Sequence, residues 1–362
     1  MNPITISKGI LRAVSIMLGI ALLLYFLYQI QAVLVYLAIA GVISLIGRPV
    51  VLFLRRRLKF KNIFSVIVTM FLMVAIIFGL FSLFIPLVRE QSDNLSLLDI
   101  NALQDNLQDL YTQTVDYLHL KNIDIEQSFR ESNLLSKLDF NAIPDLLNLV
   151  IGTIGDFTIG LFSVLFISFF FLKDSRLMEN GIMIFVPDEK EYQLKNSIEK
   201  IKDLLSRYFV GLVFQILILF IIYTIVLAIV GVHNAIVIAF LVALLNLIPY
   251  IGPLVGAFLI VLLTMTNFLG QDFQSVIIPK ASWVLIGFII GQLVDNFFSQ
   301  PVIFSTSVKS HPLEIFLIIL MAGILFGVVG LMVAIPVYTA IKVILKEFLA
   351  ENKIVRNITK DL

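Results

Sequence analysis

The chain has 362 residues, of which 59% are hydrophobic and only 14% charged, and its mean hydropathy is +1.01. Soluble globular proteins are about half apolar and about one quarter charged, so this composition excludes a soluble single-core enzyme and a disordered protein. The net charge of +1 gives no general field for an anionic polymer, and we expect no nucleic-acid partner. Because there are no cysteines and only three histidines, we expect no disulfide and no zinc site. The composition predicts an all-α, polytopic membrane protein.

Long apolar stretches recur along the chain, and a membrane-spanning helix needs about 20 such residues. We identify eight, at residues 10–28, 32–54, 62–88, 147–172, 208–231, 234–268, 277–299 and 312–345. The first follows two bases, as in a secretory signal, but its apolar run exceeds the usual length of about 7–15 residues. We therefore interpret it as a retained span. The pattern predicts an N-terminal three-span scaffold at 1–88 and a fourth span at 147–172.

Positive charge is concentrated between the second and third stretches. Six bases and no acid occur there, namely Arg48, Arg55, Arg56, Arg57, Lys59 and Lys61. Since loops rich in Lys and Arg remain in the cytoplasm, we expect this segment to be cytoplasmic, together with the N-terminus that carries Lys8 and Arg12. The bases of residues 346–362 predict a cytoplasmic C-terminal tail in the same way.

Two polar segments separate the predicted spans. Residues 89–146 contain eleven acids and four bases, and leucines at helical spacing between 103 and 118 indicate an amphipathic helix. We expect an extracytoplasmic helical loop, which either packs on a helix bundle or forms a ligand domain. Residues 173–207 hold a second amphipathic helix rich in lysine. It is either a cytoplasmic helix at a surface of anionic lipid or a solvated connector.

The stretch 234–268 is too long for one span and is interrupted near its middle. The interruption contains Asn246, Pro249, Tyr250, Gly252 and Pro253. Two prolines and a glycine so close together do not continue a helix. Non-helical backbone at membrane depth persists only where protein or a wet cavity surrounds it. We therefore predict two half-helices that meet at a buried tip.

The stretch 312–345 has the same property. It begins at His311-Pro312 and is weakened by three glycines, Gly323, Gly327 and Gly330. The two regions also form a weak internal repeat, in which Gln215, His233 and Gly252 correspond to Gln292, His311 and Gly330. A second re-entrant hairpin would return the chain to the cytoplasmic side, as the positive-inside rule requires. Paired interrupted segments are typical of secondary transporters, so we predict a transport unit at 208–345.

Asp295 is an isolated acid deep in the C-terminal half of the chain. A carboxylate at the bilayer centre costs roughly 2.5–3.5 kcal/mol on insertion scales, so such a group is normally paired, hydrated or functional. Helical spacing places Gln292, Asn296 and Ser299 on the same face. Together with Asn246 and the carbonyls freed near Pro249, they would form a site for a cation or a small hydroxylated solute. The alternative is an interfacial acid at the cytoplasmic end of the span.

The sequence contains no HExxH, GxSxG or phosphate-binding glycine loop followed by Lys-Ser/Thr. We therefore expect neither an enzyme nor an ATP-driven pump, and no cofactor. A transported Na⁺, Li⁺ or H⁺ near Asp295 is the only ion that we expect, and no fixed metal.

Three segments together resemble the AI-2E (autoinducer-2 exporter) family of permeases. They are Asn-Leu-Ile-Pro-Tyr-Ile-Gly-Pro-Leu-Val-Gly at 246–256, Gly-Gln-Leu-Val-Asp-Asn at 291–296, and the run from Ser-Val-Lys-Ser-His-Pro-Leu at 307–313 to Gly330. Their order and spacing match from about 200 to 345. The resemblance implies a multi-pass protein of the bacterial inner membrane and a homo-oligomer.

Members of this family are associated with different substrates, including a quorum-sensing furanone and Na⁺ or Li⁺ exchanged for protons. We therefore predict a secondary-active transporter, either an exporter of a small solute resembling autoinducer-2 or a Na⁺(Li⁺)/H⁺ antiporter. Its partners would be membrane lipids and the transported solute or monovalent cation. The alternative is a non-transporting membrane scaffold or a passive channel.

Overall fold

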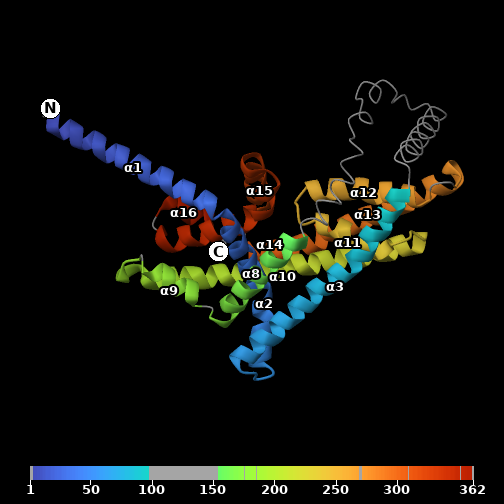
Figure 1. The fold of residues 1–362 in the computed structure, drawn as a ribbon, viewed down its shortest axis with the longest axis horizontal. Helices are drawn as coiled ribbons and strands as arrows, with labels where there is room; N and C mark the ends of the chain where they lie inside the picture. The colour runs from blue at the N-terminus through green and yellow to red at the C-terminus, as the bar shows by residue number, and fades with distance from the viewer. Residues whose placement is uncertain are drawn as a thin grey trace. The chain divides into compact units, whose positions relative to one another are not determined.

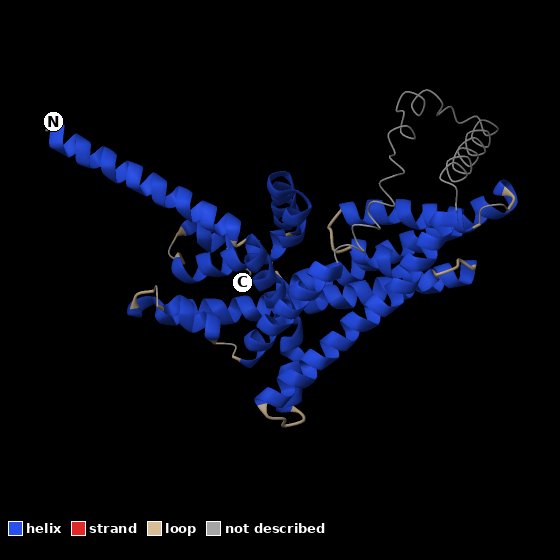
Figure 2. Cartoon of the chain, viewed as in Figure 1, coloured by secondary structure: helices blue, strands red, loops and turns tan. Residues whose placement is uncertain are grey.

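The computed structural model describes residues 3–97, 154–174, 176–184, 186–268, 271–308, 310–350 and 352–360. Within these residues every regular element is a helix and none is a strand (Figure 2). Six of the described helices are long and apolar enough to cross a membrane, and shorter apolar helices accompany them. The predicted all-α polytopic membrane fold is confirmed.

The chain forms two compact units. The first comprises Met1–Met70 and Gly155–Met178, and the second comprises Phe71–Ile154 and Glu179–Leu362. All residues of the predicted transport site belong to the second unit.

The first unit contains three helices and the beginning of a fourth. They are α1 (Pro3–Gln29), α2 (Gln31–Arg56), α8 (Ile154–Lys173) and the first residues of α3 (Asn62–Leu97). The Asn62 amide donates a hydrogen bond to the Lys173 carbonyl (3.0 Å), which joins the start of α3 to the end of α8. Helix α3 extends nine residues beyond the expected end at residue 88. The rest of the predicted loop at 89–146, including its amphipathic helix, lies outside the described residues.

Helix α10 (Glu191–Val230) merges two elements that the sequence separates. The expected amphipathic helix before residue 207 and the expected span after it form one helix of 40 residues. The physical reason is that this segment has no proline and a single glycine, so nothing ends the helix at the change from polar to apolar residues. The short helix α9 (Leu177–Met183) and the turn η1 (Asp188–Lys190) precede it.

The first interrupted stretch folds as a helical hairpin. Helix α11 (Ala235–Leu245) and helix α12 (Ile251–Asn267) pack against each other across a turn in which Tyr250 has a positive φ of 64°. At the open end, Asn267 accepts a hydrogen bond from the backbone N–H of His233 (3.0 Å). The two ends of the hairpin therefore lie at the same level, as the re-entrant prediction requires.

The next long helix contains two wide π-helical turns. It runs through η2 (Phe273–Ile277), α13 (Ile278–Val294), η3 (Asp295–Ser299) and α14 (Gln300–Ser307). Each π turn ends two residues before a proline, Pro279 or Pro301. A proline lacks the N–H group that an α-helix needs and its ring crowds the carbonyl four residues earlier, so local widening relieves the conflict. The helix is therefore longer than the predicted span at 277–299.

The last stretch also folds back on itself, within α15 (Pro312–Phe348). Gly327 has φ 62° and ψ −145°, a conformation almost restricted to glycine, and it interrupts the helix. A Cβ atom at Gly323 would lie 2.6 Å from Leu331, although eight residues of straight helix span about 12 Å. Farther out, the Lys342 ammonium donates to the Ser310 hydroxyl (2.6 Å) and joins the two arms at their base. The second predicted hairpin is therefore present, and the short helix α16 (Lys353–Ile358) follows it.

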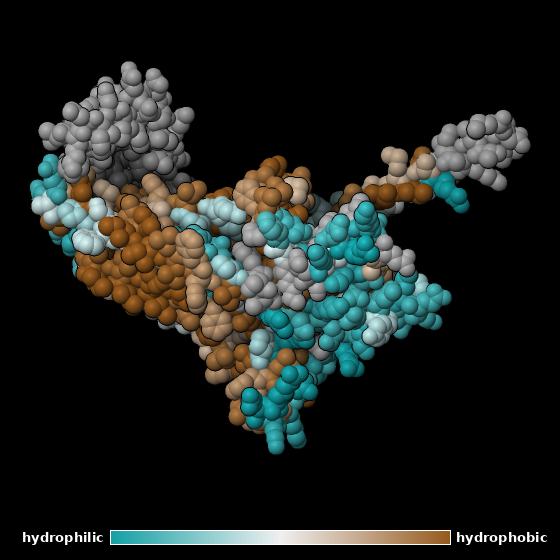
Figure 3. Space-filling view, turned by 180° about the vertical axis from the view of Figure 1, so that it is seen from behind, coloured by the Kyte–Doolittle hydropathy of each residue, from teal (hydrophilic) through white to brown (hydrophobic). Residues whose placement is uncertain are grey.

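Both hairpins pack on α10, which forms the centre of the second unit (Figure 1). The first hairpin shares a buried cluster with the C-terminal part of α10 and with α13, around Tyr223, Val242 and Phe288. The second packs near Tyr208 and Ile303. Apolar side chains cover the outside of α11 to α13, whereas hydrophilic side chains gather over α9 and the beginning of α10 (Figure 3). This distribution fits a bilayer around the hairpin-bearing part of the unit.

Candidate transport site

Asp295 lies at the start of the π turn η3, and its side chain is 1% exposed. One carboxylate oxygen, Oδ2, accepts hydrogen bonds from the amides of Gln215 on α10 (3.0 Å) and Gln300 on α14 (2.8 Å). Gln300 also donates to the Asn296 side chain (3.0 Å). The carboxylate thus lies between two amide donors, one from α10 and one from α14.

The second carboxylate oxygen of Asp295, Oδ1, is buried and has no hydrogen-bond partner among the described residues. The Ser299 hydroxyl lies close to the carboxyl group, but it is also without a partner in hydrogen-bonding geometry. In the described part of the chain, no Lys, Arg or His forms an ion pair with Asp295. A buried carboxylate without a basic partner requires a proton or a bound cation for neutrality.

A second polar cluster lies one turn away along α13. Gln292 donates hydrogen bonds to the Tyr223 hydroxyl on α10 (2.9 Å) and to the side-chain oxygen of Asn246 (2.9 Å). Asn246 ends α11 and donates in turn to the Val242 carbonyl (3.1 Å). These bonds connect the tip of the first hairpin to both long helices beside it.

Glycines allow α10 and the α13–α14 helix to approach closely enough for these contacts. A Cβ at Gly291 would lie 2.6 Å from the Tyr223 ring, and one at Gly287 would overlap Val226. At the other end of the contact, a Cβ at Gly211 would lie 2.8 Å from Ile303. In a membrane, lipid tails are as apolar as leucine, so helix association depends on such close packing of small residues. The Gly287–Gly291 spacing therefore helps to place Asp295 beside Gln215.

Several of the predicted site residues meet here and others do not. Gln215, Gln292, Asn246 and Asp295 lie in the two clusters, but Gln292 does not bond Asp295 as a shared helical face would suggest. Asn296 is exposed and reaches Asp295 only through Gln300.

The remaining predicted residues shape the hairpins. Pro249, Tyr250, Gly252 and Pro253 form the tip of the first hairpin, where the Tyr250 ring packs edge-on against Phe316 of the second (centroids 5.4 Å apart). The bend of the second hairpin contains Gly323, Gly327 and Gly330. His311 and Pro312 begin α15, and the His311 ring accepts a hydrogen bond from the Leu313 N–H (3.3 Å).

Sequence reasoning missed Tyr223 and Gln300 as members of the clusters. Tyr223 follows Gln215 by eight residues, about two helical turns, and this spacing in an uncharged span was an available signal. The role of Gln300 depends on the π turn, which shifts it toward Asp295. No three His, Cys, Asp or Glu residues of the described chain gather to hold a metal ion.

Helical spans, two hairpins and a buried polar centre define a multi-pass membrane protein. The model of the AI-2E family transporters matches residues 15–350, and the chain belongs to this family. It is therefore a member of a transporter family and not an enzyme.

Three relatives extend this comparison. The Bacillus subtilis (strain 168) protein named "Putative transport protein YueF" is 27% identical over 319 residues, which cover 84% of this chain and 81% of the relative. YrrI of the same strain, which carries the same description, is 28% identical over 184 residues (51% of this chain, 50% of the relative). The Methanocaldococcus jannaschii protein MJ1177, which also carries this description, is 26% identical over 178 residues (49% of this chain, 51% of the relative).

Proposed function

We propose that the protein is a secondary-active transporter in which Asp295 binds the coupling proton or cation. One observation carries this proposal: the carboxylate is buried, one of its oxygens lacks a partner, and no described base neutralises it. A structural acid in an apolar helix would be expected to have a permanent basic partner. A site that must be neutralised by a mobile ion can instead bind and release that ion during transport.

The surrounding groups support a small monovalent cation as the ion. The carboxylate and the neutral Ser299 hydroxyl offer hard oxygen ligands, and their total charge of −1 matches one Na⁺, Li⁺ or H⁺. We propose a Na⁺(Li⁺)/H⁺ antiporter on this basis.

The second candidate is an exporter of a small hydroxylated solute such as autoinducer-2. The hydrogen-bonding cluster of Tyr223, Asn246 and Gln292 favours it, since these groups suit a polar, uncharged ligand. In both cases the two hairpins would move with α10 and α13 relative to the N-terminal spans, in a homo-oligomer in the bacterial inner membrane. A passive channel or a non-transporting scaffold remains the competing class.

Flux through purified protein in liposomes tests the proposal. With an inward-directed Na⁺ or Li⁺ gradient, we expect proton movement in the opposite direction and accumulation that stops when both gradients are dissipated. A channel would instead carry flux only down the gradient of its own solute, and a scaffold would match empty liposomes. Either of these results, with properly inserted protein, would reject the proposal.

We also propose cytoplasmic N- and C-termini. Single cysteines in this cysteine-free chain should react with impermeant reagents from the cytoplasmic side at 48–61, 174–206 and 346–362, and from outside at 90–145. The reason is that each hairpin returns to the side from which it enters, so only the full spans cross the membrane. Their number is even, which leaves both termini on the same side. External labelling of the C-terminal tail would contradict this orientation.

A further inference from the structure

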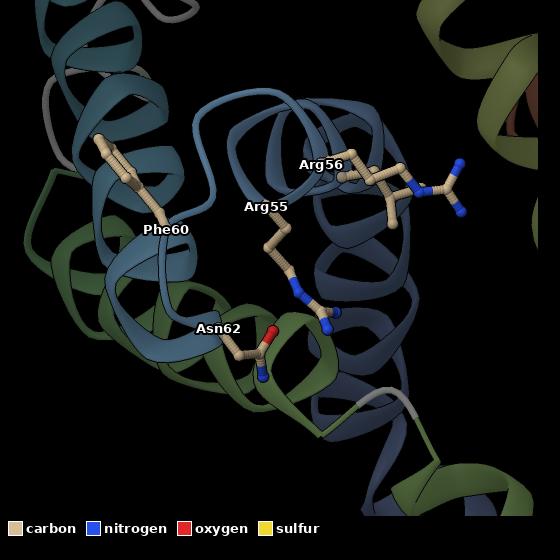
Figure 4. Close-up of a pocket in the computed structure, with 5 residues that line it drawn as sticks. Arg55, Arg56, Phe60 and Asn62 are labelled. Carbon is tan, nitrogen blue, oxygen red and sulfur yellow. The ribbon is translucent and has the colours of Figure 1, made fainter.

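The loop that joins α2 to α3 borders a half-open cavity of about 370 Å³. Its walls are formed by Leu52, Arg55, Arg56, Phe60 and Asn62, all within the first compact unit. In Figure 4 the guanidinium of Arg55 extends toward Asn62, whereas that of Arg56 extends away from it. A planar cation and an amide therefore face the same space.

Backbone contacts give this loop a defined shape. The N–H of Arg57 donates to the Phe53 carbonyl (2.9 Å), and the N–H of Phe60 donates to the Leu54 carbonyl (3.2 Å). Between them Lys59 adopts a positive φ of 54°, which turns the chain toward α3.

Asn62 is held in place by α8. One N–H of its amide is used by the Lys173 carbonyl, so the other N–H is available to a ligand. The cavity thus presents a guanidinium fork and a fixed amide donor side by side.

The charges around the cavity are almost all positive. Residues 48–61 contain six bases and no acid. At the end of α8, Asp174 is paired with Lys173 (3.7 Å). Within the described residues, neither Arg55 nor Arg56 forms an ion pair with an acid. An arginine fork with no protein carboxylate is suited to a phosphate, which it can bind through two parallel hydrogen bonds.

The cavity lies where lipid phosphates are found. Gln31–Arg56 and Asn62–Gly79 are both candidate membrane spans, so the loop between them emerges at a bilayer surface. Phe53 and Phe64 flank the loop and are 58% and 53% exposed, which leaves apolar surface beside the cavity for acyl chains. A free anion would use only the polar part of this surface.

We propose that this cavity binds the phosphate headgroup of an anionic phospholipid, with Arg55 and Asn62 as its ligands. Basic pockets between membrane helices are known to favour such headgroups. The lipid would fix the α2–α3 loop at the membrane surface. This site is independent of Asp295 and of the transport proposal.

Titration of the purified full-length protein with phosphatidylglycerol and phosphatidylcholine, followed by native mass spectrometry, tests the site. We expect phosphatidylglycerol to bind preferentially, and Arg55→Ala to weaken its binding about tenfold, as loss of a charge-assisted hydrogen bond predicts. Arg57→Ala is the matched control, because it removes the same charge from the same loop without touching the cavity wall. It should change binding by less than about twofold. Arg55→Gln serves as a second variant if Arg55→Ala does not fold.

The phosphate group could belong to a lipid headgroup or to a free anion. Competition with inorganic phosphate and glycerol phosphate distinguishes these two sources. We expect neither to displace the lipid at millimolar concentration. Full displacement would identify a site for a free anion and overturn the lipid proposal. Equal losses in Arg55→Ala and Arg57→Ala would show diffuse attraction by the basic loop, and equal binding of both lipids would also overturn the proposal.

Discussion

Asp295→Asn is expected to abolish gradient-driven flux while the protein still folds. An asparagine oxygen can accept the hydrogen bonds of Gln215 and Gln300, and its amide nitrogen replaces the unpaired carboxylate oxygen without a change of shape. The side chain loses its charge and its ability to exchange a proton. We expect apparent cation affinity to fall by about 10- to 100-fold, the usual loss for a charged partner. Flux measured against pH in liposomes should also lose the pH dependence that this carboxyl group produces.

Asp188→Asn provides the matched control for this change. Asp188 lies exposed in the turn before α10, so the same chemical substitution should leave flux and its pH dependence unchanged. Size-exclusion profiles of both variants should match the wild type. If Asp295→Asn transports at the full rate with an unshifted pH curve, the carboxylate is an interfacial acid and the proposed role is wrong.

Gly252→Ala is expected to remove most transport through an effect on the first hairpin. A Cβ atom at this position would overlap the backbone carbonyl of Leu245, and no side-chain rotation can relieve such a contact. Overpacking of this kind costs about 1–3 kcal/mol, which the turn must absorb by opening. Opening moves Asn246 away from Gln292 and separates the hairpin tip from α13. We expect flux in liposomes to fall more than about tenfold, while membrane insertion is retained.

Gly41→Ala separates this effect from a general intolerance of alanine. Gly41 lies in α2 with no heavy atom within 4 Å of its ideal Cβ position, so its replacement should change flux by less than about twofold. Gly330→Ala should behave like Gly252→Ala, since its Cβ would overlap the Ala322 carbonyl at the second bend. Normal flux in Gly252→Ala would show that the turn only ends a helix and does not support transport.

The two matched glycines also show why the weak repeat was informative. Gly252 and Gly330 were paired in the sequence by spacing alone, and each meets a backbone carbonyl seven or eight residues earlier in the structure. Spacing could predict that both stretches turn back, because prolines and glycines clustered within a few residues disfavour a continuous helix. The continuity of α10 through residue 207 was not predictable in the same way. The polarity changes there, but a change in polarity does not end a helix.

The sequence by itself determined the membrane class, the helical spans and both hairpins, and it indicated Asp295 as a candidate, because these follow from local composition and from the cost of a charge in lipid. Only the tertiary structure decided which groups surround that carboxylate. Gln215 lies 80 residues from Asp295, and Tyr223 lies 69 residues from Gln292. Their contacts depend on the close approach of two helices at small glycines and on a π turn before Pro301. The spacing of polar residues encodes neither feature, since Gln292 and Asp295 are joined by ordinary α-helix and still bond to different partners.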